Sequence, residues 1–454
     1  MKKLIFTIFG STGDLTSRKL LPALSKLYKD NKIPKETKII CLGRKDLNTK
    51  SYLTYMNDES SAPLDLKTLE QIVEYHKIQI TDKNDYNELK KIISKETDNQ
   101  TKQLYYLAIG PELFFDVAQN INHSGLIEKA NENQLIIFEK PFGHDLKSAK
   151  KINQMLWEFF DEKQIYRIDH YLGKEMIQNI MMVRFANRIF EEVWYNRTIK
   201  NVKIIVKETD GIFNRGGYYD QSGALKDMVQ SHLIQMLSMV SMEVPLSYHS
   251  EDVKNEKVKA IENVSFDSNS FIFGQYEGYL NEDKVNKDSK TETFVFIKAF
   301  VNTPRFKGVP FYLMTGKKLD QKESVIIVEF EETSEQRKWN LPLSTNKLYI
   351  KIAPDDGVGL KFNSKVPGLT GDVQEVELEY CAACNAVGNL SEAYEKLLLE
   401  ATESHKTLFT RWDEIELSWK LIEHIKEKQT DPIIYNDYKA LQVLIKEKMD
   451  VKMP

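Results

Sequence analysis

One block of ten residues holds the side chains with the clearest chemical use: Arg167-Ile168-Asp169-His170-Tyr171-Leu172-Gly173-Lys174-Glu175-Met176. His170, Tyr171 and Lys174 can each donate a hydrogen bond to a phosphate. Lys174 also precedes a predicted helix, and a helix N-terminus favours anions. Asp169 would repel the same phosphate, so we expect its carboxylate to orient a different group. The block therefore predicts a binding site for a phosphorylated substrate.

A second polar set lies on a predicted amphipathic helix over residues 223–235, which carries Asp227 and His232 among Met, Leu and Val. A lone histidine on such a helix is more often a hydrogen-bonded core residue than a catalytic group. Asp169 favours the catalytic alternative, because a carboxylate can hold an imidazole in one tautomer. Oxidation of an alcohol by hydride transfer requires a base for the hydroxyl proton. We therefore predict His232 as this base and Asp169 as its partner.

Hydride transfer also needs an acceptor that side chains cannot supply. The turn Gly10-Ser11-Thr12-Gly13-Asp14-Leu15 follows a buried-strand pattern and precedes a helical one, as in sites that place a pyrophosphate at a helix N-terminus. The turn departs from the G-x-G-x-x-G motif, because Thr12 and Leu15 occupy the second and third glycine positions. A plain β-α turn therefore remains an alternative to a nucleotide site.

The end of the second predicted strand, residues 38–43, bears on the choice of cofactor. NAD-binding folds carry an acidic residue there for the ribose 2′-hydroxyl, whereas this chain has Gly43-Arg44-Lys45. Arg44 could hold a 2′-phosphate through two hydrogen bonds. This predicts NADP as cofactor, with a solvated surface arginine as the alternative.

Composition narrows the classes of protein to consider. Of 454 residues, 41% are apolar and 29% charged, which is typical of a globular protein, and the length favours two domains. A net charge of −4 gives no field that would attract nucleic acid or an anionic membrane. No run approaches the roughly 20 apolar residues of a transmembrane helix. The sequence has no cluster of His, Asp and Glu typical of a metal site, and we predict no metal.

The three cysteines, Cys41, Cys381 and Cys384, are too few for a disulfide-stapled secreted protein and favour a reducing compartment. Cys381-Ala-Ala-Cys384 has the spacing of a redox or zinc motif, but a zinc site needs four ligands and there is no second pair. We predict an ordinary strand end there and assign it no function. The N-terminus shows no signal-peptide pattern, so we predict a cytoplasmic protein.

The apolar pattern changes near residue 170. Before it, short buried-strand patterns alternate with helical ones, which predicts a Rossmann-like α/β domain over residues 1–170 with a doubly wound parallel sheet. The predicted strands include residues 4–9, 38–43, 103–108 and 135–139, and the predicted helices include residues 20–27 and 114–121.

After residue 170 few helices separate the predicted strands. This predicts an α+β domain over residues 171–454 with a large, mostly antiparallel sheet. The predicted elements are a helix over 175–190, strands over 202–208, 271–276, 293–300, 325–330 and 348–352, and a helical stretch over 391–448. We predict that the charged residues 281–288 form an exposed loop.

Separated blocks along nearly the whole chain resemble the glucose-6-phosphate dehydrogenase family. The blocks are residues 10–21, 139–143 (Glu-Lys-Pro-Phe-Gly), 167–175, 215–220 (Arg-Gly-Gly-Tyr-Tyr-Asp), 223–235, 309–312 with 315–317, 365–368 (Lys-Val-Pro-Gly) and 392–398.

The resemblance implies oxidation of D-glucose 6-phosphate at C1 to 6-phospho-D-glucono-1,5-lactone, with NADP as hydride acceptor, at the start of the oxidative pentose phosphate pathway. In that family the residue matching His232 is the general base, and the one matching Asp169 orients it. The substrate phosphate is bound at the positions of His170, Tyr171 and Lys174, with help from Lys322. The remaining implied residues are Glu208, Asp227 and Lys317 at the sugar, Lys140 near sugar and nicotinamide, and Thr12, Arg44 and Pro111 at NADP.

Some positions depart from the family pattern. Ser231 stands where Asn usually precedes the catalytic histidine, and Met314 stands where Arg often precedes Thr-Gly-Lys. The chain after residue 437 lacks the Gly/Trp/Pro-rich ending of many members. These departures remove no catalytic group, and we predict a homodimer or homotetramer.

Two other functions remain as alternatives. A dehydrogenase for another sugar phosphate, or one linked to NAD, would share the turn but should lack the combined set of Asp169, His170, Lys174 and His232. A non-catalytic NADP-binding sensor could keep the fold, but binding alone gives no reason to retain an Asp-His pair.

Overall fold

The computed structural model describes residues 2–342, 344–385 and 392–454. Residue 391, with which the predicted C-terminal helical stretch begins, lies outside the described residues. The chain divides into two compact units. The first comprises Met1–Gly173 with Ser391–Glu416, and the second comprises Lys174–Leu390 with Leu417–Pro454.

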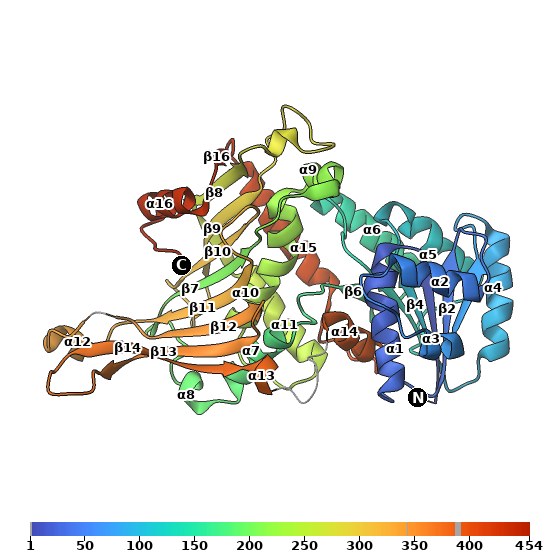
Figure 1. The fold of residues 1–454 in the computed structure, drawn as a ribbon, viewed down its shortest axis with the longest axis horizontal. Helices are drawn as coiled ribbons and strands as arrows, with labels where there is room; N and C mark the ends of the chain where they lie inside the picture. The colour runs from blue at the N-terminus through green and yellow to red at the C-terminus, as the bar shows by residue number, and fades with distance from the viewer. Residues whose placement is uncertain (1, 343, 386–391) are drawn as a thin grey trace. The chain divides into compact units, whose positions relative to one another are not determined.

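The first unit is built on a seven-stranded sheet in the order β15-β6-β5-β4-β1-β2-β3, with helices on both faces (Figure 1). Strand β15 is antiparallel to β6, and the other pairs are parallel. Without β15, the order 3-2-1-4-5-6 is that of the Rossmann fold, as predicted. The strands are β1 (Lys3–Phe9), β2 (Glu36–Gly43), β3 (Val73–Lys77), β4 (Thr101–Leu107), β5 (Gln134–Phe138), β6 (Ile165–Ile168) and β15 (Phe409–Thr410).

The helices of this unit cover a sheet whose central strands are buried on both faces. All residues of β4 are buried, and β1 is buried from its second residue on, because helices exclude water from both faces of a parallel sheet. The helices are α1 (Leu21–Lys29), α2 (Thr49–Glu59), α3 (Leu66–Ile72), α4 (Lys83–Glu96), α5 (Phe114–His123), α6 (Leu146–Phe159) and α14 (Ala393–Thr402). Shorter helical turns are Thr16–Leu20, Pro111–Leu113 and Glu162–Gln164.

Residues 391–416 return to the first unit, although the sequence-based division at residue 170 assigned them to the second domain. Lys102, on β4, donates a hydrogen bond of 2.8 Å to the carbonyl of Thr402. Tyr394 donates one of 3.0 Å to the carboxylate of Glu139, at the end of β5. These contacts join positions far apart in sequence, so no local pattern indicates them.

The second unit contains a nine-stranded sheet in the order β14-β13-β12-β11-β7-β10-β9-β8-β16. Among the described strands, β7 with β10 and β8 with β16 are parallel pairs and the rest are antiparallel, which confirms the predicted mostly antiparallel sheet. The strands are β7 (Ile199–Lys207), β8 (Val264–Tyr276), β9 (Phe294–Val301), β10 (Pro310–Gly316), β11 (Glu323–Phe330), β12 (Lys347–Ala353), β13 (Gly357–Lys365), β14 (Val373–Cys381) and β16 (Ile433–Tyr435).

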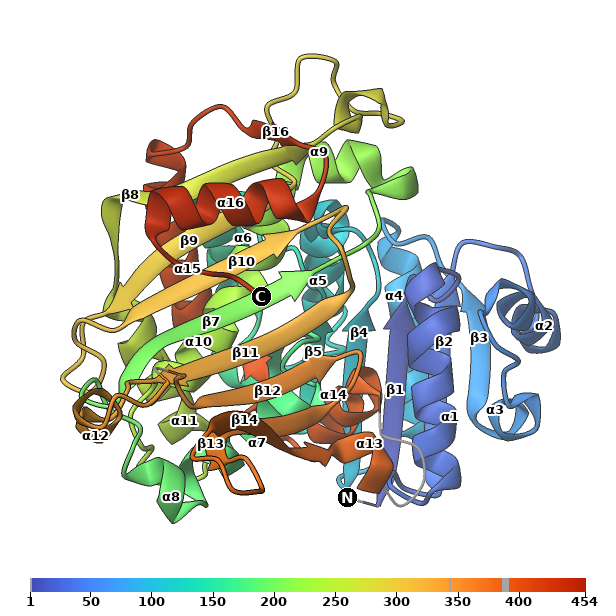
Figure 2. The ribbon, with the colours of Figure 1, turned by 60° about the vertical axis from the view of Figure 1, so that its left-hand side comes forward.

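Helices pack on both faces of this sheet. Helix α16 crosses one face, where Tyr438, Leu441 and Ile445 join a core with residues of β7, β9 and β11, and α10 lies on the other face (Figures 1 and 2). The helices are α7 (Glu175–Phe185), α8 (Arg188–Glu191), α9 (Gly216–Ala224), α10 (Ile234–Ser241), α11 (Ser250–Glu262), α12 (Ser334–Lys338), α13 (Ala382–Asn385) and α16 (Tyr438–Met449). The remaining helical segments are Phe213–Arg215, the π-helical segment Leu225–Leu233 and Tyr279–Asn281, together with α15 (Trp412–Glu427), which begins in the first unit and ends in the second.

Two local predictions differ in detail from the structure. The single helix predicted over residues 175–190 is two helices, because Asn187 is extended and its side chain donates to the carbonyls of Met182 and Val183 at the end of α7. The predicted loop 281–288 is largely exposed, but Val285 is buried in the core of the unit. The described helices include none that combines the length and apolar character needed to span a bilayer.

The structure of the cysteine pair Cys381 and Cys384 differs more from the prediction. Cys381 ends β14, as predicted, but its sulfur forms a disulfide with that of Cys384. The spacing is that of a redox motif, but the sequence analysis favoured an ordinary strand end and did not predict this bond. Cys41 is free and buried in β2.

Candidate active site

The turn after β1 brings the backbone close to the end of β4. Gly10 has φ +75°, and a Cβ on it would lie 2.3 Å from the carbonyl oxygen of Ala108. Only glycine fits both the left-handed conformation and this approach. The two strands are neighbours at the point where the strand order reverses, which is where open α/β sheets bind ligands.

Hydrogen bonds hold the rest of the turn in place. The amide of Ser11 donates to the carbonyl of Leu42 over 2.9 Å, and the amide of Gly13 donates to that of Gly10 over 3.1 Å. The hydroxyl of Tyr52 donates to the carbonyl of Ser11 over 3.0 Å. Ser11 is thus buried, whereas Gly13 and Asp14 are exposed where the helical segment begins. Exposed backbone at this position can face a pyrophosphate.

Three of the residues predicted to contact the cofactor, Thr12, Arg44 and Pro111, lie at strand ends of the same edge. Thr12 packs against the end of β2, since a Cβ on Gly43 would lie 2.8 Å from its methyl group. Arg44 follows directly and is exposed. Pro111 begins a helical turn just after β4. The structure therefore brings Thr12, Arg44 and Pro111 to the carboxyl edge of the sheet, around the reversal point.

Lys140 follows β5 at this same edge, next to a half-buried carboxylate, Glu139, to which the sequence analysis gave no role. Glu139 accepts hydrogen bonds from the hydroxyls of Tyr106 and Tyr394. Burial raises the pKa of the Glu139 carboxyl, and burial together with Glu139 raises that of Tyr394. Two sequence signals could have drawn attention to Glu139: it directly follows an apolar strand, and it begins the block 139–143 that resembles the family.

The block after β6 is held by its own backbone. One carboxylate oxygen of Asp169 accepts the amide of Tyr171 over 3.0 Å, and the carbonyl of Asp169 accepts the amide of Leu172 over 3.0 Å. The rings of His170 and Tyr171 meet edge to face, with centroids 5.1 Å apart. Lys174 is the N-cap of α7 and the first residue of the second unit. The sequence block therefore folds as a tight turn that leads into a helix.

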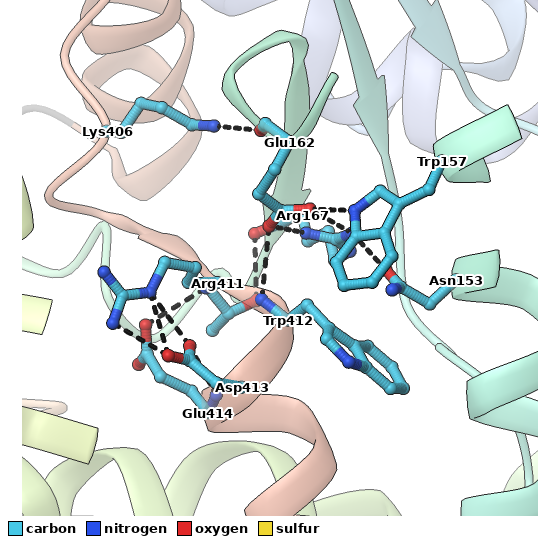
Figure 3. Close-up of polar contacts among 10 residues, drawn as sticks. Asn153, Trp157, Glu162, Arg167, Lys406, Arg411, Trp412, Asp413 and Glu414 are labelled. Atoms are coloured by element: carbon cyan, nitrogen blue, oxygen red, sulfur yellow. Dashed lines mark hydrogen bonds and ion pairs between the residues drawn. The ribbon is translucent and has the colours of Figure 1, made fainter. Parts of the chain in front are cut away.

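An ion pair between a buried arginine and a half-buried glutamate anchors the strand that carries this turn. Arg167, on β6, donates to both carboxylate oxygens of Glu162, and Glu162 also accepts the indole N–H of Trp157 and the amide of Trp412 (Figure 3). The Arg167 guanidinium holds the pKa of Glu162 below its usual value against the opposing effect of burial. Sequence reasoning included Arg167 in the block but gave it no role.

In the second unit, Glu208 and Lys317 lie at the ends of neighbouring strands, β7 and β10. The ammonium of Lys317 is 2.6 Å from the carboxylate of Glu208 and 5.1 Å from the ring centroid of Tyr219. A carboxylate and an ammonium so placed can bind sugar hydroxyls as acceptor and donor. The structure thus brings together two residues predicted from separate motifs.

Asp227 and His232 lie on the π-helical segment Leu225–Leu233, and both are buried. The carboxylate of Asp227 hydrogen-bonds the phenol of Tyr218; burial, with a smaller contribution from Asp227, raises the pKa of Tyr218 to about 12. Gly223 has φ +63°, so the helical segment begins after it rather than at residue 223. Lys322 is exposed before β11, and within the described residues the structure gives it no hydrogen bond or ion pair.

Comparison with known protein families gives one matching profile for each part of the chain. The family profile for the NAD binding domain of glucose-6-phosphate dehydrogenase matches residues 7–179, and the profile for its C-terminal domain matches residues 181–447. The chain belongs to the glucose-6-phosphate dehydrogenase family. The first unit is therefore a dinucleotide-binding domain with a nicotinamide cofactor.

Individual members of the glucose-6-phosphate dehydrogenase family match over most of their length. Glucose-6-phosphate 1-dehydrogenase of Bacillus subtilis is 38% identical over 448 residues, which cover 94% of this chain and 91% of the relative. A glucose-6-phosphate dehydrogenase solved in complex with its substrate glucose 6-phosphate is 34% identical, with a TM-score of 0.89 over 96% of this chain and 94% of the other. The enzyme from Mycobacterium avium is 29% identical, with a TM-score of 0.87 over 100% of this chain and 98% of the other.

Proposed function

We propose that this protein oxidises D-glucose 6-phosphate at C1 to 6-phospho-D-glucono-1,5-lactone and transfers the hydride to NADP. The observation that carries the proposal is that each unit assembles its own share of the predicted site. The first holds the nucleotide turn and the Asp169 turn up to Gly173, and the second holds Lys174, Glu208 paired with Lys317 on strand ends, and His232 in a buried helix.

The residues at the carboxyl edge of the first sheet fit a dinucleotide. The close approach of Gly10 to Ala108 leaves the turn without side-chain bulk, and Thr12 and Arg44 flank it. We assign the pyrophosphate to residues 10–15 and the 2′-phosphate to Arg44, whose guanidinium can donate two parallel hydrogen bonds. When bound, the nicotinamide supplies the acceptor for the hydride. Pro111 and Lys140 complete the contacts that we assign to the cofactor.

For the substrate, we assign the 6-phosphate to His170, Tyr171 and Lys174, with Lys322 as a further cation. Glu208, Asp227 and Lys317 bind the sugar hydroxyls, and Lys140 contributes near C1. Contacts to the hydroxyls and the phosphate of the sugar fix its C1 relative to the base. Such orientation of the reacting groups lowers the barrier to the reaction.

Chemistry at C1 needs one proton transfer. We assign to the His232 imidazole the removal of the C1 hydroxyl proton as the hydride leaves the same carbon and the C1–O bond becomes a carbonyl. Asp169 then hydrogen-bonds the imidazole and stabilises the imidazolium that forms. This assignment needs no metal ion.

The test is formation of reduced nicotinamide by the purified protein with glucose 6-phosphate, run in parallel with NADP and NAD and with unphosphorylated glucose as control. Phosphate-dependent turnover that favours NADP supports the whole proposal. Turnover that favours NAD keeps the reaction and removes the role of Arg44. Binding of the cofactor without turnover would contradict the proposed enzyme activity and support the alternative of a non-catalytic sensor.

We further infer a homodimer or homotetramer in the cytoplasm. The support for an oligomer is the broad sheet, whose edge strand β14 exposes Leu378 and Tyr380. Light scattering on a gel-filtration column gives the mass of the particle in solution, and a monomeric mass would contradict the inference. Cell fractionation tests the location.

A further inference from the structure

The helix that carries Asp227 and His232 is continuous from the π-helical segment Leu225–Leu233 into α10, and we call it the 225–241 helix. Its ends meet side chains from two other elements of the second unit. Glu292 lies at the first end and Arg184 at the last, and both are buried, with exposed fractions of 5% and 2%. Neither residue has a role in the reaction proposed above.

Glu292 binds the start of the helix. Its carboxylate oxygen Oε1 accepts the amide of Leu225 over 3.0 Å, and its carbonyl accepts the amide of Ala224 over 3.0 Å. Oε2 accepts the side-chain amide of Gln429 over 2.8 Å, which fixes the carboxylate from its other side. The first amides of a helix have no partner within it, so Glu292 satisfies groups that would otherwise be buried without one.

Gly223 makes this contact possible. Its φ of +63° ends α9 and turns the chain so that the following amides point at Glu292. A Cβ on Gly223 would lie 2.3 Å from Oε1 of Glu292. The position of Glu292 therefore requires a residue without a Cβ at position 223, and glycine also takes up the positive φ there.

Arg184 binds the end of the helix from α7. Its two terminal nitrogens donate to the carbonyls of Met239 and Met242, each over 2.7 Å. The indole of Trp194 donates to the carbonyl of Val240 over 3.1 Å, and its ring lies 5.4 Å from the guanidinium. Burial lowers the pKa of Arg184 to about 9, and the nearby charge of Arg305 acts in the same direction. Burial of a guanidinium is costly, and the helix carbonyls offset that cost.

The charges of Glu292 and Arg184 are complementary to the dipole of the helix. The N-terminus of a helix carries partial positive charge and the C-terminus partial negative charge, so an acid at the first end and a base at the last both stabilise it. Arg184 also lies on α7, which begins directly after Lys174. The helix with the proposed base is thereby tied to the helix that follows the proposed phosphate ligand.

We propose that Glu292 and Arg184 are positioning residues that set where the 225–241 helix lies along its axis, and with it the imidazole of His232 and the carboxylate of Asp227. This rests on the proposed function, in which His232 is the base. A shift of about 1 Å at a reacting group can cost on the order of 100-fold in rate, so a side chain that touches no substrate can still control turnover.

The test compares Glu292→Ala and Glu292→Gln with Glu329→Ala. Glu329 is the matched control, because its carboxylate accepts hydrogen bonds from Asn201 and Lys203 on β7 and from Thr345 just before β12, and none of these lies on the helix. We expect Glu292→Ala to lower kcat about 10-fold or more while KM for glucose 6-phosphate changes less than about 3-fold. Glu292→Gln keeps an acceptor for Leu225 and should recover most of kcat, and Glu329→Ala should keep kcat even where it lowers the melting temperature.

Two measurements do not depend on turnover. Amide hydrogen exchange should accelerate over residues 225–233 in Glu292→Ala and over residues 234–242 in Arg184→Met, but over neither in Glu329→Ala. The ring signals of His232, assigned by their loss in His232→Asn, should move in Glu292→Ala and stay in place in Glu329→Ala. Should Glu292→Ala fail to fold, Arg184→Lys provides the same comparisons from the other end of the helix, with amide exchange followed over residues 234–242.

The outcomes separate the two proposals. A wild-type protein that does not oxidise glucose 6-phosphate contradicts the proposed function, and the exchange and ring-signal measurements then decide the positioning role alone. A wild-type protein that turns over, with equal kcat in Glu292→Ala and Glu329→Ala, overturns the positioning role and leaves the proposed function intact. Unchanged exchange and unchanged His232 signals in Glu292→Ala overturn it as well.

Discussion

Arg167 and Glu162 form a two-pronged ion pair at the foot of the turn that carries Asp169. The terminal nitrogens of Arg167 lie 2.6 and 3.0 Å from the two carboxylate oxygens of Glu162, and the guanidinium also donates to Asn153 over 2.6 Å (Figure 3). Because Glu162 in turn accepts the amide of Trp412, the pair joins β6 to the returning segment of the first unit. Removing either charge leaves the other without its partner.

We expect Arg167→Met to lower the free energy of unfolding by about 3 kcal/mol, since it strands a largely enclosed carboxylate. Urea unfolding followed by tryptophan fluorescence measures the change. The control is Arg188→Met, whose guanidinium is exposed and pairs with Glu191 on the surface, and its cost should stay below about 1 kcal/mol. Equal costs for the two variants would show that the Arg167 pair contributes no more than a surface one.

His232→Asn tests the assignment of the base. Asparagine keeps a polar side chain in the buried site but cannot take a proton, so we expect kcat to fall by about 10² to 10⁴-fold while KM for glucose 6-phosphate stays nearly constant. Steady-state kinetics with NADP give both constants. Near-normal turnover by this variant would refute the assignment.

Arg44→Gln tests the choice of cofactor. Loss of a charge-assisted pair to the 2′-phosphate should raise KM for NADP about 10-fold or more. NAD has no 2′-phosphate, so KM for NAD measured with the same variant is the internal control and should not change. A parallel rise in both constants would mean that Arg44 contacts a group common to the two cofactors.

Lys102 gives the first unit a stability that depends on pH. Its ammonium is buried against the carbonyl of Thr402 and the hydroxyl of Ser404, and burial lowers its pKa from 10.5 to about 8. Between these values the unfolded chain binds more protons than the folded one, so the free energy of unfolding should rise with pH across this window. Lys102→Met should flatten that rise, as measured by urea unfolding at intervals from about pH 7 to pH 10.

The control for Lys102 is Lys91→Met, which replaces an exposed lysine on α4 that pairs with Glu88. This variant should keep the wild-type slope of stability against pH. If Lys102→Met keeps it too, another group sets the pH dependence in this window.

The architecture could be predicted because the signals for it are local. The continuous apolar runs of β1 and β4 indicate strands buried on both faces, and the strand-turn-helix at Gly10 indicates a dinucleotide fold. The predicted bounds of single helices were wrong where the backbone conformation of one residue decides where a helix begins or ends. Residues 175–190 form two helices because Asn187 is extended, and the 225–241 helix starts late because Gly223 has a positive φ.

The site was predicted in part for the same reason. Residues within one motif, such as His170 and Tyr171, are neighbours by sequence, whereas Glu208 and Lys317 lie 109 residues apart and meet only because β7 and β10 are adjacent strands. Glu139 and Tyr394 both lie in blocks that resemble the family, but their contact could not be predicted, because the partners of Glu139 are 33 and 255 residues away in the sequence.

The sequence by itself determined the class of fold, the nucleotide turn and the residue types available for phosphate binding and proton transfer, because strand burial, turn conformation and side-chain chemistry are properties of short segments. Only the tertiary structure decided which charged groups are buried and what they contact. Glu292 and Arg184 are ordinary residues in the sequence, and they acquire a role because the fold places one at each end of the helix that carries His232. Because both charges are buried, their few hydrogen bonds are important for stability. A charge that is removed from water is stabilised only by the partners that the fold supplies.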